Sequence, residues 1–394
     1  MNRNSSGATT KDTSVCTGIL AFAVLLLATA TGCDASENKH SPVGLVGGID
    51  LIPEFMMVGE VEHLIVQGNY AYGNTLDKLL IVDISNPAAP VKAGEINISE
   101  LSRIRALVVR GSDLLIAAGP NNGDVYLYLA DTSDHGHLQI RGRVKIYDKV
   151  RDHLVPSPVE ELSIVVGDNH IYVIGFAELK VIDVFDLSEP RLIADTSELS
   201  GNLALKSSSR YWVRLSSDYD GSFLRVFDSE EESNPKVVGK VNLGELDITA
   251  AASVQNFVYI GARVLNAESG QHYNGLFVYD ISEPSSPQRI GESNLGAGLM
   301  VGTHQGAQTM SMVAVTDIVV SGSYAYIAES HAGIKVVDVS NPAAPEYIAT
   351  LETRISATDL ATDGRYLYAV NNNKFISPFD LMIFQLMPDK DITP

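Results

Sequence analysis

One phrase occurs twice in this chain, and it constrains the fold more than any other feature of the sequence. Residues 81–95 read IVDISNPAAPVKAGE, and residues 336–350 read VVDVSNPAAPEYIAT. Each phrase lies in a longer unit with the same order of features. These are a strand, a glycine turn, a Tyr-x-Tyr strand, a loop, an apolar strand ending in Asp, a Pro-x-x-Pro corner and a last strand. A unit that recurs so far along the chain predicts a repeat architecture.

Weaker copies of the unit bring the number of repeats to seven. They lie at 61–96, 106–132, 167–195, 222–241, 256–292, 315–351 and 358–386. Each unit predicts about four strands over about 40–58 residues, which is the size of a propeller blade. The third strand is apolar on consecutive residues, as in LLIVDI at 79–84, so both of its faces are expected to be buried. We therefore predict an all-β fold, a seven-bladed β-propeller.

Two local features explain how such a ring would turn its corners and close. The Asp after each third strand can bond the backbone N–H two residues on, and the prolines end the strand. The last unit lacks its fourth strand, while IPEFMMVGEV at 52–61 resembles the fourth strands of other units. We predict that this N-terminal segment completes the seventh blade, which removes an exposed sheet edge.

At LLIVDISNPAAP and IKVVDVSNPAAP the sequence resembles the LVIVD-repeat proteins, which are β-propeller proteins of bacterial and archaeal cell surfaces. The resemblance covers about residues 52–386 and is strongest in the first and sixth units. It implies a propeller fold and a surface location. It implies little about chemistry, because the activity of the family is poorly defined.

The first 33 residues have the pattern of an export signal. Arg3 and Lys11 precede the apolar run ILAFAVLLLATA, which is too short to span a bilayer, and small residues lead to Cys33. Gly-Cys here resembles the lipobox of bacterial lipoproteins, which implies that Cys33 is acylated; the alternative is a plain secretory signal. The predicted order is a lipoprotein signal peptide (1–32), a lipidated Cys33 with a flexible tether (33–49), the propeller (50–388) and a C-terminal tail (389–394).

The composition of the chain limits the classes of partner that the protein is expected to bind. The formal net charge is −20, the wrong sign for a nucleic-acid-binding surface. No cysteine follows Cys33, so the exported domain is expected to fold without disulfides and without a thiol nucleophile. An acylated Cys33 would hold the protein on a membrane of the cell envelope without spanning it. We expect a monomer.

Two sets of residues are candidate binding sites. Alignment of the second strands places His63, Asp317 and Asp359 at one first-strand position in three neighbouring blades, where they can bind a divalent metal ion. The alternative is that they line a wet channel and bond nearby backbone. The insertion AGLMVGTHQGAQTMSM, at 297–312, carries Met300, His304, Met310 and Met312, which can bind copper or serve as apolar filler. As the longest interblade insertion, it is the predicted specificity element.

Enzyme motifs are missing: the sequence has no G-x-S-x-G, P-loop or H-E-x-x-H. The sequence thus favours a binding scaffold for protein or glycan ligands at the cell envelope. The alternative is an extracytoplasmic metal-dependent hydrolase with His63, Asp317 and Asp359 at its centre.

Overall fold

A computed structural model describes residues 43–49, 63–74, 78–97, 103–120, 123–134, 138–148, 162–175, 178–196, 203–218, 221–265, 272–297, 299–304, 307–330, 332–351, 357–371 and 381–386. The chain divides into two compact units, Met1–Lys39 and His40–Pro394, and these residues all belong to the second. Every regular element in these ranges is a β-strand. Within them, no helix is long and apolar enough to cross a membrane.

Seven antiparallel sheets of four strands form seven blades. Blade 1 consists of β2 (His63–Gln67), β3 (Tyr70–Asn74), β4 (Lys78–Asp83) and β5 (Val91–Asn97). Blade 2 consists of β6 (Ile104–Arg110), β7 (Asp113–Ala118), β8 (Val125–Asp131) and β9 (Gln139–Tyr147). Blade 3 consists of β10 (Ser163–Val166), β11 (His170–Ile174), β12 (Leu179–Asp183) and β13 (Arg191–Thr196).

The remaining blades repeat this order. Blade 4 consists of β14 (Leu203–Lys206), β15 (Tyr211–Asp218), β16 (Gly221–Asp228) and β17 (Lys236–Gly244). Blade 5 consists of β18 (Asp247–Val254), β19 (Phe257–Leu265), β20 (His272–Asp280) and β21 (Gln288–Ala297). Blade 6 consists of β24 (Asp317–Ser321), β25 (Tyr324–Ala328), β26 (Ile334–Asp338) and β27 (Glu346–Leu351). Blade 7 consists of β28 (Ala357–Thr362), β29 (Tyr366–Asn371), β30 (Leu381–Leu386) and β1 (Val43–Ile49). Between blades 5 and 6, β22 (Leu299–His304) and β23 (Ala307–Met312) form a separate two-stranded sheet.

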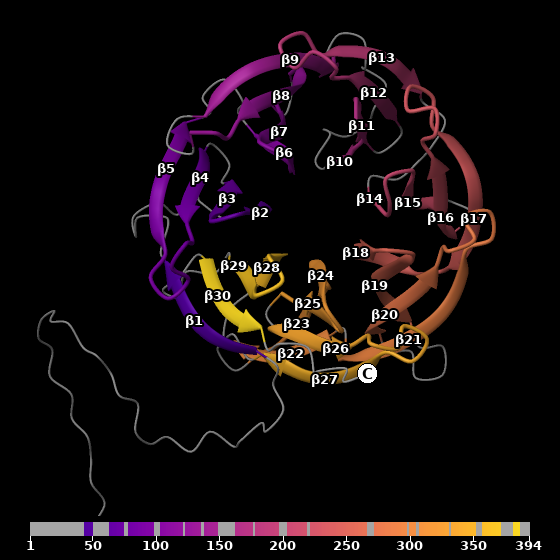
Figure 1. The fold of residues 1–394 in the computed structure, drawn as a ribbon. Coiled ribbons are helices and arrows are strands. Elements are labelled where there is room, and N and C mark those ends of the chain that lie inside the picture. Colours follow the sequence, from indigo (N-terminus) through magenta and orange to yellow (C-terminus); the bar gives the residue numbers. More distant parts are fainter. Residues whose placement is uncertain are drawn as a thin grey trace, which may run out of the picture. The chain divides into compact units, whose positions relative to one another are not determined.

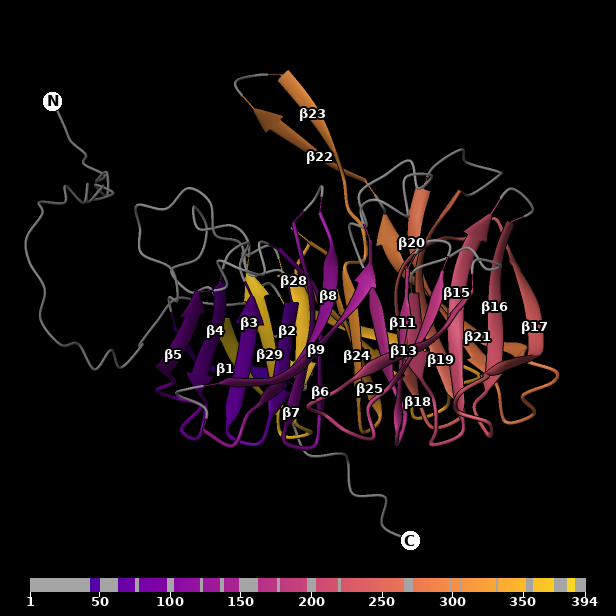
Figure 2. The same ribbon diagram turned by 90° about the horizontal axis from the view of Figure 1, so that it is seen from above.

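The blades are arranged as a closed ring, so the predicted seven-bladed propeller is confirmed (Figure 1). The first strand of each blade lies innermost. Each inner strand contacts the next one around the ring, and β28 of blade 7 contacts β2 of blade 1. Short turns lie on one face of the ring, while the β22–β23 hairpin rises from the other (Figure 2).

The hydrophobic core consists of seven clusters, one between each pair of neighbouring blades. Strand β4 shows why the third strands are apolar on consecutive residues. Leu80 and Val82 pack against blade 7, whereas Leu79 and Ile81 pack against blade 2. Both faces of the sheet are therefore buried, as predicted.

The corner after the third strand has the predicted turn chemistry in blades 1 to 6. In each, the Oδ1 atom of the aspartate accepts a hydrogen bond of 2.8–2.9 Å from the backbone N–H two residues on. The aspartates are Asp83, Asp131, Asp183, Asp228, Asp280 and Asp338. Blade 7 ends its third strand at Leu386 without an aspartate.

An N-terminal strand completes blade 7, but it is not the predicted segment. Strand β1 pairs antiparallel with β30, from Val43 opposite Leu386 to Ile49 opposite Leu381. The prediction placed the closing strand at 52–61, which lies outside the described residues. It also assigned 43–49 to a flexible tether, which is wrong because these residues are in the sheet. The sequence VGLVGGI contains three glycines and no Asp-Pro phrase, so it has little of the repeat signature.

Candidate functional site

The predicted metal site lies on three consecutive inner strands. His63 begins β2, Asp317 begins β24, and Asp359 is in β28, which contacts both of the other strands. Asp317 and Asp359 are hydrogen-bonded to each other. No three His, Cys, Asp or Glu side chains gather as metal ligands within the described part of the chain. The structure therefore brings the two aspartates together, but His63 does not complete a three-ligand group with them.

Each carboxylate also binds the backbone of the next blade. Asp317 Oδ2 accepts a 2.7 Å hydrogen bond from the N–H of Leu360 in blade 7. Asp359 Oδ2 accepts one of 2.7 Å from the N–H of Leu64 in blade 1. In blade 3, Ser163 Oγ likewise accepts a 3.1 Å hydrogen bond from the N–H of Ala204 in blade 4. Because the same contact recurs, a polar side chain at this first-strand position links each inner strand to the next by a hydrogen bond.

The two carboxyl groups share a proton because two adjacent carboxylates in a dehydrated site cannot both remain ionised. Asp317 and Asp359 are partly buried. Loss of water around the carboxyl group is the largest effect on Asp317, and it raises the pKa of this residue. Dehydration and the charge of Asp317 raise the pKa of Asp359 well above its usual value. The pair therefore binds a proton more tightly than two isolated carboxyl groups would.

His63 is a neutral residue in this arrangement. Burial, together with the positive charge of Arg103, lowers the pKa of His63 to about 4. A neutral imidazole could be a metal ligand. Its neighbour Leu64, however, is the residue whose N–H donates to Asp359, so this part of β2 is held against blade 7 by backbone rather than by the ring of His63.

The predicted specificity insertion is a β-hairpin rather than a loop. Strand β22 pairs with β23 from Leu299 opposite Met312 to His304 opposite Ala307. The four candidate copper ligands are Met300, His304, Met310 and Met312. By register they pair with Ser311, Ala307, Val301 and Leu299 respectively, so no two of them are cross-strand partners. The copper site stays a prediction.

A cleft that sequence analysis did not predict lies between blades 1 and 2, at the face of the ring opposite the β22–β23 hairpin. It has a volume of about 460 Å³, and its walls are the first turn of each blade and the corner that follows β8. The turns contain Gly68 and Gly111, both with φ of +56°, a conformation that favours glycine. The two turns are joined directly, because Gln67 Nε2 donates a hydrogen bond to the carbonyl oxygen of Gly111.

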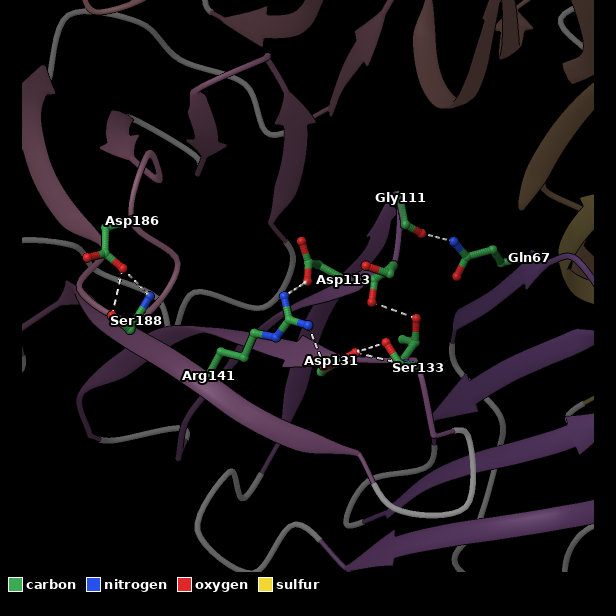
Figure 3. Close-up of polar contacts among 10 residues, drawn as sticks. Gln67, Gly111, Asp113, Asp131, Ser133, Arg141, Asp186 and Ser188 are labelled. Carbon is green, nitrogen blue, oxygen red and sulfur yellow. Dashed lines mark hydrogen bonds and ion pairs between the residues drawn. The ribbon is translucent and has the colours of Figure 1, made fainter.

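An ion network supports the blade 2 side of this cleft (Figure 3). The guanidinium of Arg141 on β9 pairs with Asp131 and, at 3.2 Å, with Asp113. Asp131 also accepts hydrogen bonds from the hydroxyl (2.6 Å) and the N–H (2.8 Å) of Ser133. The Ser133 bonds, and then the Arg141 pair, lower the pKa of Asp131 to about 2. Asp131 is therefore an ionised, fixed acceptor that orients Ser133. At the next corner, Asp186 holds Ser188 in the same way.

The equivalent position between blades 3 and 4 is occupied by a carboxylate. Glu232, from the blade 4 corner, accepts hydrogen bonds from the N–H groups of Asp168 (2.7 Å) and Asn169 (3.1 Å). Its other contact is with His170 Nδ1, at 2.9 Å. Burial acts to raise the pKa of Glu232, but the hydrogen bonds from His170 and the two amides outweigh burial and lower it. At this corner a charged side chain therefore links blades 3 and 4, whereas the residues that line the cleft between blades 1 and 2 are neutral.

Buried cations form a further group, on blades 2 to 4. Arg105 donates to the carbonyl oxygens of Gly119 and Pro120, and Arg214 donates to that of Gly175. Lys180 is paired at 2.9 Å with both Glu178 and Asp195. Burial, followed by the charge of Arg225, lowers the pKa of Arg214 to about 10. These contacts tie loop backbone to the strands.

Two features of the sequence lie at the cleft, but neither of them predicts a binding site. The unit at 106–132 is the weakest full copy and lacks the corner prolines. The turn phrase Gly-Asn-Tyr at 68–70 reads as ordinary hairpin chemistry. Only the ring brings the first turns of two blades and one corner together.

The comparisons with known proteins agree with this architecture. A family model described as the LVIVD repeat matches residues 58–97, 162–196, 270–294 and 314–353. No curated protein matches the chain. Among solved structures, a chain of the Mitotic Checkpoint Complex is similar with a TM-score of 0.57 and 12% identity, over 93% of this chain and 100% of that one.

Two further structures show the same fold similarity. The structure of U3-55K has a TM-score of 0.56 and 11% identity, over 87% of this chain and 98% of that one. The computationally designed Ika8 protein has a TM-score of 0.53 and 12% identity, over 87% and 99%. At this identity the likeness shows the fold alone. The chain thus carries LVIVD repeats in four of the seven blades of its propeller.

Proposed function

We propose that this protein is a monomeric binding scaffold of the cell envelope, held on a membrane through acylated Cys33, which presents a protein or glycan ligand with one face of its propeller. The observation that carries the proposal is the β22–β23 hairpin, which rises from the ring between blades 5 and 6 (Figure 2). At the equivalent connection between blades 4 and 5, only Glu245 and Leu246 separate the strands.

The composition of the hairpin supports a role in contacting a binding partner. Residues 297–312 include no Asp, Glu, Lys or Arg, although the chain as a whole has a net charge of −20. An exposed strand edge is usually protected by charged residues or proline. Six of the seven outer strands, β5, β9, β13, β17, β21 and β27, each carry at least one charged residue, and β1 is the exception. An uncharged two-stranded hairpin is marginally stable in water, so a bound partner would stabilise it.

A metal-dependent hydrolase is the less favoured hypothesis for the function of this protein. Two of the three residues at its predicted centre, Asp317 and Asp359, already accept backbone hydrogen bonds from neighbouring blades. A group that fastens the ring at both carboxyls has a structural role that accounts for its burial and shared proton. The geometry thus favours a scaffold with its recognition element on the hairpin.

The test is a photo-crosslinking residue at Thr303 or Gln308 of the hairpin, with the same residue at Lys236 on the outer strand β17 as the matched control. In cells, the hairpin positions are expected to give a defined adduct and Lys236 none. Replacement of 299–312 by a short Gly-Ser linker should abolish capture and leave the melting temperature unchanged, because the hairpin is a sheet of its own. Capture that persists in the linker variant would show that the hairpin is not the recognition element.

A further inference from the structure

The cleft between blades 1 and 2 is preorganised before any ligand arrives. Thr132 Oγ1 donates a 2.7 Å hydrogen bond to the carbonyl oxygen of Ser112, which also accepts from the Thr132 N–H at 2.8 Å. Gln67 Nε2 donates to Gly111 across the two turns. The cleft walls are therefore held by two hydrogen bonds within blade 2 and by one between blades 1 and 2. The cleft volume of about 460 Å³ falls in the range of small-molecule sites.

Gln67 and Ser133 are the lining residues whose side-chain oxygens can accept hydrogen bonds from a ligand. The donors of Gln67, Thr132 and Ser133 are already engaged with protein oxygens. The carbonyl oxygen of the Gln67 side chain is buried and has no hydrogen-bond partner within the described part of the chain. The hydroxyl oxygen of Ser133 retains lone pairs, since its proton is directed to the carboxylate of Asp131. A ligand that supplies hydroxyl donors would satisfy these atoms.

The remaining lining selects against charge and supplies an aromatic surface. Gln67, Asn69, Ser112, Thr132 and Ser133 are neutral, and the nearby carboxylate of Asp131 is already paired with Arg141. The chain charge of −20 disfavours anions. Tyr70, which is half-buried, contributes an aromatic ring to the wall. Hydroxyl donors on a compact, uncharged body with apolar C–H faces are the features of a sugar.

We propose that this cleft binds a neutral saccharide, with Tyr70 against a face of the sugar ring and with Gln67 and Ser133 accepting from its hydroxyl groups. The site lies on the face opposite the β22–β23 hairpin and shares no residue with it (Figure 2). It is therefore independent of the proposed recognition element.

The experiment is saturation-transfer NMR and titration of the full-length chain with glucose, galactose, mannose, N-acetylglucosamine, maltose and cellobiose. Glucuronic acid and glucosamine serve as the charged analogues. At least one neutral sugar is expected to show saturation transfer to its ring protons, and the charged analogues to bind more weakly. Tyr70→Ala should weaken binding about tenfold, as loss of a stacking contact would. Ser133→Ala, at an exposed position that should not disturb folding, should also weaken it.

Tyr366→Ala is the matched control, because Tyr366 begins β29 as Tyr70 begins β3 and lines no part of the cleft. It should bind as the parent does, and so should the hairpin linker variant. The proposal is overturned if no neutral sugar binds, if the charged analogues bind equally well, or if Tyr70→Ala and Ser133→Ala both leave binding unchanged. Since the linker variant retains this cleft, failure here leaves the test of the hairpin intact.

Discussion

At the scale of single residues, a glycine in the fourth strand decides how closely two blades approach. Gly142, Gly239 and Gly291 occupy the same position in blades 2, 4 and 5, opposite the third-strand residue that lies two before the corner aspartate. A Cβ atom on each would overlap a carbonyl oxygen at the corner of the next blade, that of Leu187, Pro284 or Pro342. The corner backbone thus packs directly on the glycine.

Gly239→Ala is expected to lower the free energy of unfolding by about 1–3 kcal/mol, because the methyl group overlaps backbone that cannot rotate away. Urea unfolding measures this. Val238→Ala is the control, since Val238 is the adjacent residue and is 37% exposed. It should change stability by about 0.5 kcal/mol or less. Equal effects of the two substitutions would contradict the close contact.

The shared proton of Asp317 and Asp359 predicts an unusual pH dependence. The folded-state pKa of each is raised, so the folded state binds protons more tightly than the unfolded one. The stabilisation is therefore complete below the unfolded pKa of about 4 and is lost as pH rises from there through the raised pKa. His63 acts in the opposite sense, since its lowered pKa favours folding above about pH 6.5.

Asp359→Asn isolates the carboxyl pair. Asparagine can donate to Asp317 and accept from the Leu64 N–H, as the protonated aspartate does, without titrating. We expect the melting temperature of the parent to fall relative to that of Asp359→Asn as pH is raised from 4 to 8, and Asp359→Ala to be less stable than both. A difference between parent and Asp359→Asn that does not vary with pH would argue against a shared proton.

At the scale of elements, β1 is the strand on which closure depends. It supplies the only partner on the outer side of β30 within the described residues, through six paired positions from Val43 to Ile49. Its loss would leave β30 with an unpaired edge and expose the outer side of blade 7 to water.

Deletion of 43–49 is therefore expected to lower the melting temperature of the whole ring and to promote aggregation. Differential scanning calorimetry and light scattering check both effects. Deletion of 35–41, an equal length of chain just before β1, is the control and should leave the transition where it is. If the two deletions melt alike, β1 does not close the ring.

Elements also show where prediction from sequence succeeded. The strands of blades 1 and 6 follow the repeated phrase closely, because the Asp corner and the apolar third strand are local patterns. The β22–β23 hairpin was expected to be a loop. Its sequence, with two glycines and scattered polar residues, lacks the alternation typical of strands, so only pairing between its two halves shows the sheet.

At the scale of the whole molecule, the proposed location depends on Cys33, which lies outside the described residues. Metabolic labelling with an alkyne fatty acid should mark the parent chain, and Cys33→Ala should abolish the label and release the protein from the membrane fraction. Cys16→Ala is the control, because Cys16 precedes the proposed cleavage site and should not alter labelling. A Cys33→Ala chain that remains labelled would refute the lipid anchor.

The sequence by itself determined the repeat unit, the number of blades and the turn chemistry, since each is written in consecutive residues such as the phrase ending at Asp83 or Asp338. The tertiary structure alone decided three things: that β1 closes the ring, that Asp317 and Asp359 are hydrogen-bonded to each other, and that Gln67, Tyr70 and Ser133 meet in one cleft. The reason is physical. Ring closure joins groups from different blades, and no local pattern specifies which residues will meet across such an interface.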